Sequence, residues 1–204
     1  MIWENGFIRS NKIILLSKIV VIVGSVRRDR NGIKVARWLE QKLKERNHHV
    51  DFVDPIELNL PLLDRMYKEM EDPPQKLNDL QQIIKNADGY LPVTPEYNHS
   101  ISSALKNTLD HFLEEYFFKP SAIVSYSVGG FGGNLAGAHL RQIFAELGAP
   151  AISSSFVVSR VGNVFDNDGN LVDEKYNERI KRFLDEFEWY IEAFKNQREK
   201  GTPY

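Results

Sequence analysis

Short apolar runs alternate along this chain with longer segments in which apolar residues recur every three or four positions. Residues 18–23 form an almost uninterrupted β-branched run, and residues 33–46 follow with one apolar stripe. A strand that helices cover on both faces has no polar position, so the first run predicts a central strand of a parallel sheet. The second segment has the spacing of a helix that packs across that sheet.

The alternation continues to the C-terminus. Four further strands are predicted, at residues 50–54, 89–94, 121–126 and 152–158. Four further amphipathic helices are predicted, at about residues 75–86, 104–112, 136–147 and 176–194. Strands that alternate with helices predict an α/β fold with a parallel sheet and right-handed crossovers. Because a Rossmann glycine fingerprint is missing, the five strands favour a doubly wound sheet in the order 2-1-3-4-5, with helices on both faces.

Two stretches disturb this pattern. Pro92 lies within the third predicted strand, and proline removes a ladder hydrogen bond, so we expect this position at an edge, a bulge or the strand's irregular end. Residues 55–74 have no periodic pattern and end in the pair Pro73-Pro74. A connection of that length is usually functional or ordered by a partner, and we expect it to shape either an acceptor pocket or a subunit contact.

The composition is that of an ordinary globular protein. The chain has 204 residues, of which 42% are hydrophobic and 26% charged, and its formal net charge is -2. One α/β domain is therefore expected at residues 18–198, between an N-terminal extension, 1–17, and a C-terminal tail, 199–204. The small net charge argues against a nucleic-acid surface. The absence of cysteine excludes disulfides, thiolate nucleophiles and cysteine-bound metals.

The N-terminal apolar residues do not predict a membrane span. Residues 13–16 are apolar, but Ser17 and Lys18 interrupt the run well before it reaches spanning length, and no small-residue cleavage site follows. We therefore expect a cytoplasmic protein with no membrane insertion.

Three unusual loops follow the first, third and fourth predicted strands. Residues 24–32 combine two glycines, a serine and three arginines, and they lead to a helix N-terminus, which favours an anion and phosphate above all. Ser25 can donate a hydroxyl hydrogen bond, and Arg27 offers a planar fork to two phosphate oxygens. Residues 95–100 form a rigid turn, and residues 127–133 contain four glycines.

In the order 2-1-3-4-5 the three strands that carry these loops are neighbours, so the loops meet at one rim. Ligands of open α/β sheets bind there, at the carboxyl ends of the strands. A ligand with a phosphate at one end and a planar, edge-polar ring at the other would satisfy all three loops, because a ring can lie against glycine backbone. Flavin mononucleotide (FMN) is such a ligand.

Taken together, these motifs resemble the NAD(P)H-dependent FMN reductase family of flavodoxin-like proteins, which includes quinone, azo-dye and chromate reductases. The resemblance covers about residues 18–190. It rests on Gly-Ser-x-Arg-x-x-Arg-x-Gly at 24–32, Thr-Pro-Glu-Tyr-Asn-His-Ser at 94–100, Leu-Lys-Asn at 105–107, Tyr-Ser with the glycines at 126–133, and Leu-Arg-Gln at 140–142. Ser102 departs from the pattern, because it stands where a helix-starting proline is expected.

The resemblance implies an oxidoreductase with FMN as cofactor and NADPH or NADH as co-substrate. Hydride would pass from NAD(P)H through bound FMN to a small-molecule acceptor, a quinone, free flavin or azo compound, with ping-pong kinetics. The family's usual state implies a homodimer or a homotetramer. The cofactor carries the chemistry, so no catalytic side chain is named.

The resemblance also implies which residues bind the cofactor. The phosphate would be held by Ser25, Arg27 and the amides near Asn31, Gly32 and Ile33, and Arg30 matches the pattern too. The pyrimidine edge of the flavin would meet backbone atoms of Pro95, Glu96, Tyr97 and Asn98. The other side of the ring would be flanked by Ser127, Gly129 and Gly130.

Two other functions are open. The first is a flavodoxin, an electron carrier that binds FMN without nicotinamide reactivity, although its phosphate loop is usually rich in Ser and Thr rather than Arg. The second is an interaction protein that kept the fold and lost the cofactor. Arg28 and Arg30 are candidates for the 2'-phosphate of NADPH or are solvated surface residues.

The remaining motifs favour plain structural roles. His48 and His49 are neighbours that point apart, and residues 166–170 resemble a calcium loop that has Leu171 where glycine is needed, so no metal site is predicted. The aromatic residues near the fourth helix are core or, if exposed together, a dimer face. They are Phe112, Tyr116, Phe117 and Phe118.

Overall fold

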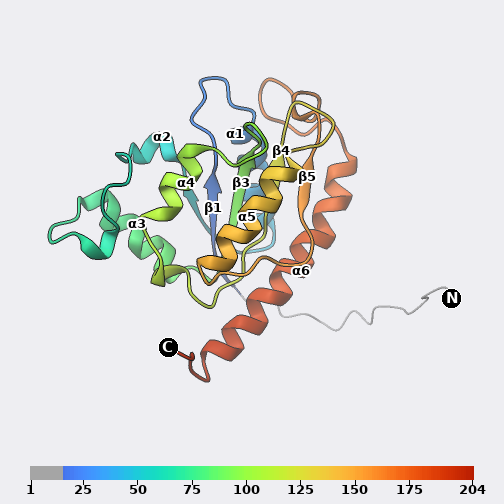
Figure 1. Cartoon of the computed structure of the whole chain (residues 1–204). Helices are drawn as coiled ribbons and strands as arrows, with labels where there is room; N and C mark the ends of the chain where they lie inside the picture. The colour runs from blue at the N-terminus through green and yellow to red at the C-terminus, as the bar shows by residue number, and fades with distance from the viewer. Residues whose placement is uncertain (1–15) are drawn as a thin grey trace.

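The computed structural model describes residues 16–204, so the predicted extension at 1–17 lies almost wholly outside the described residues. Five parallel strands form one sheet in the order β2-β1-β3-β4-β5 (Figure 1). They are β1 (Lys18–Val23), β2 (His49–Val53), β3 (Gly89–Pro95), β4 (Val124–Tyr126) and β5 (Phe156–Val158). The predicted fold class and strand order are confirmed.

Helices cover both faces of the sheet (Figure 1). They are α1 (Gly32–Glu45), α2 (Pro55–Leu58), α3 (Gln75–Asn86), α4 (Ser103–Asp110), α5 (Asn134–Glu146) and α6 (Lys175–Arg198). Three short 3-10 turns are η1 (Tyr67–Glu69), η2 (Glu114–Tyr116) and η3 (Val161–Asn163). The predicted domain limits, 18–198, stay a prediction.

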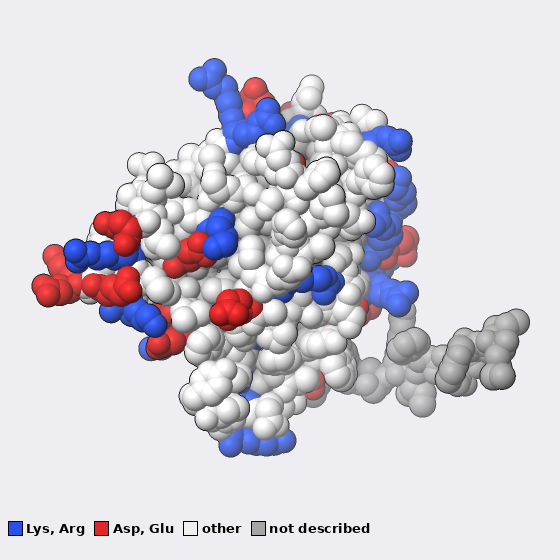
Figure 2. All heavy atoms as spheres, in the orientation of Figure 1, with Lys and Arg blue, Asp and Glu red and all other residues white. Residues whose placement is uncertain are grey.

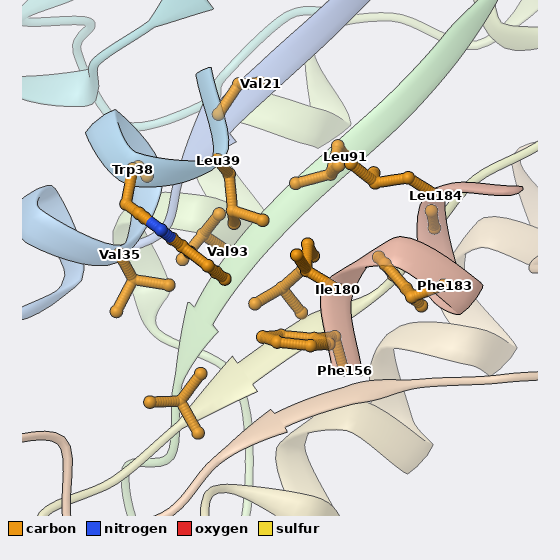
Figure 3. Close-up of a cluster of buried hydrophobic side chains, with 14 of the residues drawn as sticks. Val21, Val35, Trp38, Leu39, Leu91, Val93, Phe156, Ile180, Phe183 and Leu184 are labelled. Atoms are coloured by element: carbon orange, nitrogen blue, oxygen red, sulfur yellow. The ribbon is translucent and has the colours of Figure 1, made fainter. Parts of the chain in front are cut away.

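Strand β1 divides the core into two halves. Residues 19–23 are fully buried, with Ile19, Val21 and Val23 in one apolar cluster and Val20 and Ile22 in the other. The first cluster lies between the sheet and helices α1 and α6, whose side chains meet in Figure 3. The second cluster lies under α3, α4 and α5. Helices on both sides explain why this strand has no polar position.

The expectation for Pro92 is wrong, because Pro92 lies inside β3, which pairs with β1 and β4 on its two sides. The backbone N–H and C=O of Tyr90 both bond to the β4 side, at 3.0 and 2.8 Å, so by alternation the missing N–H of Pro92 faces that side too. The ladder between β3 and β4 is interrupted there, between the bridge at Ser121 and the start of β4 at Val124. The irregularity falls on the neighbouring strand, and β3 itself stays regular.

The same interruption shortens β4 relative to its predicted range, and β5 is shorter than predicted for a different reason. Three carbonyls of residues 152–154 accept hydrogen bonds from the guanidinium of Arg141 on α5, at 2.7 to 2.9 Å. These carbonyls are therefore used outside the sheet, and regular pairing begins only at Phe156.

The long connection 55–74 contains α2 and η1 and is held by its own chain. The side-chain amide of Asn107 on α4 donates to Pro61 O at 2.8 Å and accepts from Leu63 N at 2.9 Å. Leu62, between these two residues, is 82% exposed. The connection therefore presents an apolar side chain on a fixed backbone.

Lys119 lies buried at the amino end of the sheet. Its ammonium donates to the carbonyls of Ile84, Lys85 and Glu115 at 2.6 to 3.0 Å, and it lies 3.1 Å from the Tyr90 hydroxyl. Burial, with nearby Arg198 adding to the effect, lowers the pKa of Lys119 to about 8. Burial also raises the pKa of Tyr90 well above its usual 10.

These shifts predict how stability changes with pH. Between pH 8 and the usual lysine pKa of 10.5, the unfolded chain binds a proton that folded Lys119 lacks. The free energy of unfolding should therefore rise by about 2 kcal/mol from pH 8 to 10 and fall above pH 10, where unfolded tyrosines ionise and Tyr90 does not. Urea denaturation measures this, and a Lys119→Met variant should lose the rise. If the free energy of unfolding changed with pH in the same way in the wild-type protein and in Lys119→Met, the lowered pKa would not belong to Lys119.

Candidate functional site

A pocket of about 480 Å³ opens at the carboxyl ends of β1, β3 and β4, which is a usual size for a small-molecule site. The loops that follow these three strands converge there, as the sequence predicts. The lining residues are Ser25, Arg27, Arg28, Asp29, Arg30, Asn31, Pro95, Glu96, Tyr97, Tyr126, Ser127, Val128 and Val161. Figure 2 shows basic side chains gathered at the top of the molecule, where the loop between β1 and α1 lies in Figure 1.

Ser25 joins the first loop to the second. Its side chain is 1% exposed, and its hydroxyl lies 2.9 Å from the Tyr97 hydroxyl and accepts the amide of Arg27 at 3.4 Å. The Arg27 side chain is exposed, with its guanidinium carbon 5.9 Å from the centre of the Tyr97 ring. A hydroxyl and a free cation therefore lie side by side at this end of the pocket.

Helix α1 begins against the ring of Tyr126. A Cβ atom on Gly32 would lie 2.6 Å from Cζ of Tyr126 and closer still to its hydroxyl, so only glycine fits here. Burial, together with the neighbouring Tyr97 phenol, raises the pKa of Tyr126, so its hydroxyl stays neutral and does not repel an anion. Within the described chain, the α1 N-cap residue Asn31 makes no side-chain capping bond, which leaves the first-turn amides without that partner.

Arg30 lines the pocket, but its guanidinium is already engaged. It forms an ion pair through two parallel bonds with Asp54, and it donates to Ser25 O at 2.6 Å. The two side chains are 11% and 3% exposed. The guanidinium of Arg30, which the family resemblance includes among the cofactor-binding residues, therefore faces the end of β2.

The second loop is a tight turn. Tyr97 and Ser100 exchange two backbone hydrogen bonds, at 2.9 and 3.0 Å, across Asn98 and His99, whose φ angles are 50° and 67°. Two positive φ angles in a two-residue turn are typical of type I′, which Asn tolerates well. The predicted turn is confirmed.

Two polar side chains fix this turn to its neighbours. Glu96 accepts the amides of Leu135 and Ala136 at the start of α5, at 3.0 and 3.3 Å. Ser102 accepts the amide of Leu105 at 3.1 Å as the N-cap of α4, and it donates to Gly24 O. The serine that departs from the family pattern therefore begins the helix by capping it.

The third loop contributes Ser127 rather than its glycines. Ser127 O accepts the amide of Val161 at 3.0 Å, which brings η3 to the pocket, and Gly129 O accepts the amide of Arg160 at 3.0 Å. Gly129 is exposed and does not line the pocket, whereas Val128 does and is 79% exposed.

The predicted site residues fall into two groups. Those that line the pocket are Ser25, Arg27, Arg30, Asn31, Pro95, Glu96, Tyr97 and Ser127. Those that do not are Gly32, Ile33, Asn98, Gly129 and Gly130, of which the first two lie in the first turn of α1. The structure adds Asp29, Tyr126, Val128 and Val161, and Arg28 from the alternatives above. Tyr126 ends a predicted strand next to Ser127, which was a usable signal, but Val161 follows β5 and had none.

The remaining sequence motifs lie elsewhere. His48 is buried, with Nε2 3.1 Å from Glu188, whereas His49 is exposed and 3.3 Å from Asp51. Within residues 16–204, no group of three or more His, Cys, Asp or Glu side chains is placed to hold a metal. No helix in the same range has both the length and the apolar character that crossing a membrane requires.

Known proteins resemble this chain in sequence and in fold. The chain is 34% identical over 180 residues to a 2-hydroxy-1,4-benzoquinone reductase of Burkholderia sp., an alignment that covers 85% of this chain and 96% of the relative. The flavoenzyme FerB, an NAD(P)H:(acceptor) oxidoreductase of Paracoccus denitrificans, superposes with a TM-score of 0.74 and 26% identity, over 88% of this chain and 99% of FerB.

A flavodoxin of Pseudomonas aeruginosa superposes with a TM-score of 0.55 and 14% identity, over 86% of this chain and 99% of the flavodoxin, which shows a shared fold alone. Residues 17–163 match the family model of NADPH-dependent FMN reductases. That match covers more than half of the chain and includes all three loops of the pocket, so this protein belongs to the NADPH-dependent FMN reductase family.

Proposed function

We propose that this protein reduces a quinone or free flavin, with an azo compound as a further acceptor. It is an NAD(P)H-dependent FMN enzyme by family, and the acceptor class is inferred from the benzoquinone reductase that it resembles. The observation that carries the proposal is the convergence of three loops on one pocket, where the Ser25 hydroxyl and the loop arginines lie with the turn residues Pro95, Glu96 and Tyr97.

The residues at the pocket fit FMN. The phosphate end has the buried Ser25 hydroxyl, the amides at the start of α1 and the free Arg27 cation, a combination that suits a dianion. The neutral Tyr126 hydroxyl adds no opposing charge. When bound, FMN accepts hydride from the nicotinamide and delivers reducing equivalents to the acceptor.

We assign the following roles to the chain. Ser25, Arg27 and the amides near Asn31, Gly32 and Ile33 hold the phosphate. Backbone atoms of Pro95, Glu96, Tyr97 and Asn98 bind the pyrimidine edge of the ring. The other side of the ring is flanked by Ser127, Gly129 and Gly130. Glu96 supplies backbone only, because its carboxylate caps α5.

An anaerobic titration tests the function. The purified protein, saturated with FMN, should lose its yellow absorbance on addition of NADPH or NADH and recover it on addition of benzoquinone. The nicotinamide that bleaches it faster is the preferred reductant. Protein that stays yellow is a flavodoxin-type carrier, and protein that takes up no FMN has lost the cofactor.

We also propose a cytoplasmic homodimer or homotetramer. Phe112 and Tyr116 are core residues and Phe117 and Phe118 are half-buried, so these four aromatic side chains are not exposed together. Large exposed apolar side chains occur instead at Leu62 and Phe131, which are 82% and 84% exposed, and we assign the subunit contact to these places. Residues 55–74 do not line the pocket, which favours the subunit contact over the acceptor pocket for that segment. Light scattering after gel filtration measures the state.

A further inference from the structure

A buried ion pair lies directly behind the first loop of the pocket. Arg30 Nη1 donates to Asp54 Oδ1 at 2.7 Å, and Nη2 bonds to Oδ2, so the two planar groups meet through parallel bonds. Only 11% and 3% of the two side chains are exposed. This bidentate geometry is the most strongly oriented form of an arginine–carboxylate pair.

The pair joins three separate segments of the chain. Arg30 Nη1 also donates to Ser25 O at 2.6 Å, which lies at the start of the same loop. Asp54 follows β2 and accepts the amide of Ile56 at 3.0 Å as the N-cap of α2. The backbone of Ser25 is thereby fixed to the neighbouring strand, while its hydroxyl is held by Tyr97.

The charge of Arg30 is matched by Asp54, whereas two other loop arginines are free. Across residues 16–204, neither Arg27 nor Arg28 has a carboxylate within salt-bridge distance, and both are exposed at the pocket. The attraction for an anion therefore comes from Arg27 and Arg28. A guanidinium that left Asp54 for a ligand would leave a buried carboxylate unpaired, which is strongly unfavourable.

We propose that Arg30 and Asp54 are positioning residues for the FMN phosphate: they set the loop backbone at Ser25 in its binding shape and do not touch the phosphate. This inference rests on the proposed function, because it requires that FMN binds in this pocket. This role differs from that of a direct phosphate ligand. The two roles make opposite predictions for the FMN affinity of an Asp54→Asn variant.

The test compares FMN with riboflavin, which lacks the phosphate. Both dissociation constants are measured by quenching of flavin fluorescence. The dissociation constant of riboflavin divided by that of FMN then reports the phosphate end alone. Arg30→Lys keeps the charge but loses the fork, and Asp54→Asn keeps the shape but loses the charge. Both should weaken FMN binding by about 10- to 100-fold and leave riboflavin binding nearly unchanged, so the ratio falls in each.

A matched control exists far from the pocket. Arg46 also bonds to two carboxylates, those of Asp185 and Glu188, and to a backbone carbonyl, that of Lys181, at 2.8 to 3.1 Å. Arg46→Lys should leave the ratio unchanged. Phosphorus NMR of bound FMN gives a second readout, in which both pocket variants should shift the phosphate resonance and the control should not.

Each outcome decides between the two roles. If Arg30 were a direct ligand, Asp54→Asn would release it and keep or strengthen FMN binding, and that result would overturn the proposal, as would an unchanged ratio in Arg30→Lys. If Asp54→Asn does not fold, Asp54→Glu replaces it, with the same fall expected. A wild-type protein that binds FMN and riboflavin equally would contradict the phosphate site itself, which is a failure of the proposed function.

Discussion

Replacing Gly32 with alanine is expected to abolish tight FMN binding and to lower the free energy of unfolding by about 1 to 3 kcal/mol. The new Cβ would lie 2.6 Å from Cζ of Tyr126, and that ring is only 6% exposed, so it cannot swing into solvent. Either α1 or the ring must shift, and both border the phosphate end of the pocket. Urea denaturation and FMN titration measure the two effects.

Two further variants show that the effect is local. Gly162 lies in η3 next to the pocket residue Val161, and a Cβ there would have no heavy atom within 4 Å, so Gly162→Ala should bind FMN normally. Adding Tyr126→Ala to Gly32→Ala removes the clash and should restore part of the FMN affinity. A Gly32→Ala protein with wild-type affinity would show that this contact does not shape the site.

The Ser25→Ala variant is expected to bind FMN about 10- to 100-fold more weakly, since a hydrogen bond to a charged group contributes roughly 1.5 to 3 kcal/mol. Ser25 is 1% exposed, and its hydroxyl bonds to the Tyr97 hydroxyl and the Arg27 amide, so no water can replace it easily. Riboflavin has no phosphate, and its affinity should change little. Isothermal titration with both flavins measures the difference.

Ser153 offers a matched control for this substitution. Its hydroxyl lies 3.3 Å from the Tyr190 hydroxyl, the same type of serine–tyrosine pair at a place outside the pocket. Ser153→Ala should bind both flavins as the wild-type protein does. An equal loss of FMN and riboflavin affinity in Ser25→Ala would place the hydroxyl at the ring and not at the phosphate.

Where one local pattern decided an element, the sequence was sufficient. The buried run at residues 19–23 could only be an inner strand, and α3 begins and ends where the stripe after Pro73-Pro74 predicted, at Gln75 and Asn86. The alternation of strands and helices, together with the missing Rossmann glycine fingerprint, then favoured the strand order that the structure has. The order in turn brought the three loops to one rim, as the pocket shows.

Where the outcome depended on a partner distant in the chain, only the tertiary structure decided it. Pro92 stays in a central strand because the neighbouring strand interrupts its own ladder, and β5 is short because Arg141 takes the carbonyls before it. The sequence places several arginines in one loop, but only the position of Asp54 determines that Arg30 is engaged and Arg27 is free. Periodicity reports which face of an element is buried, whereas hydrogen-bond partners and close contacts depend on how the elements are packed in space.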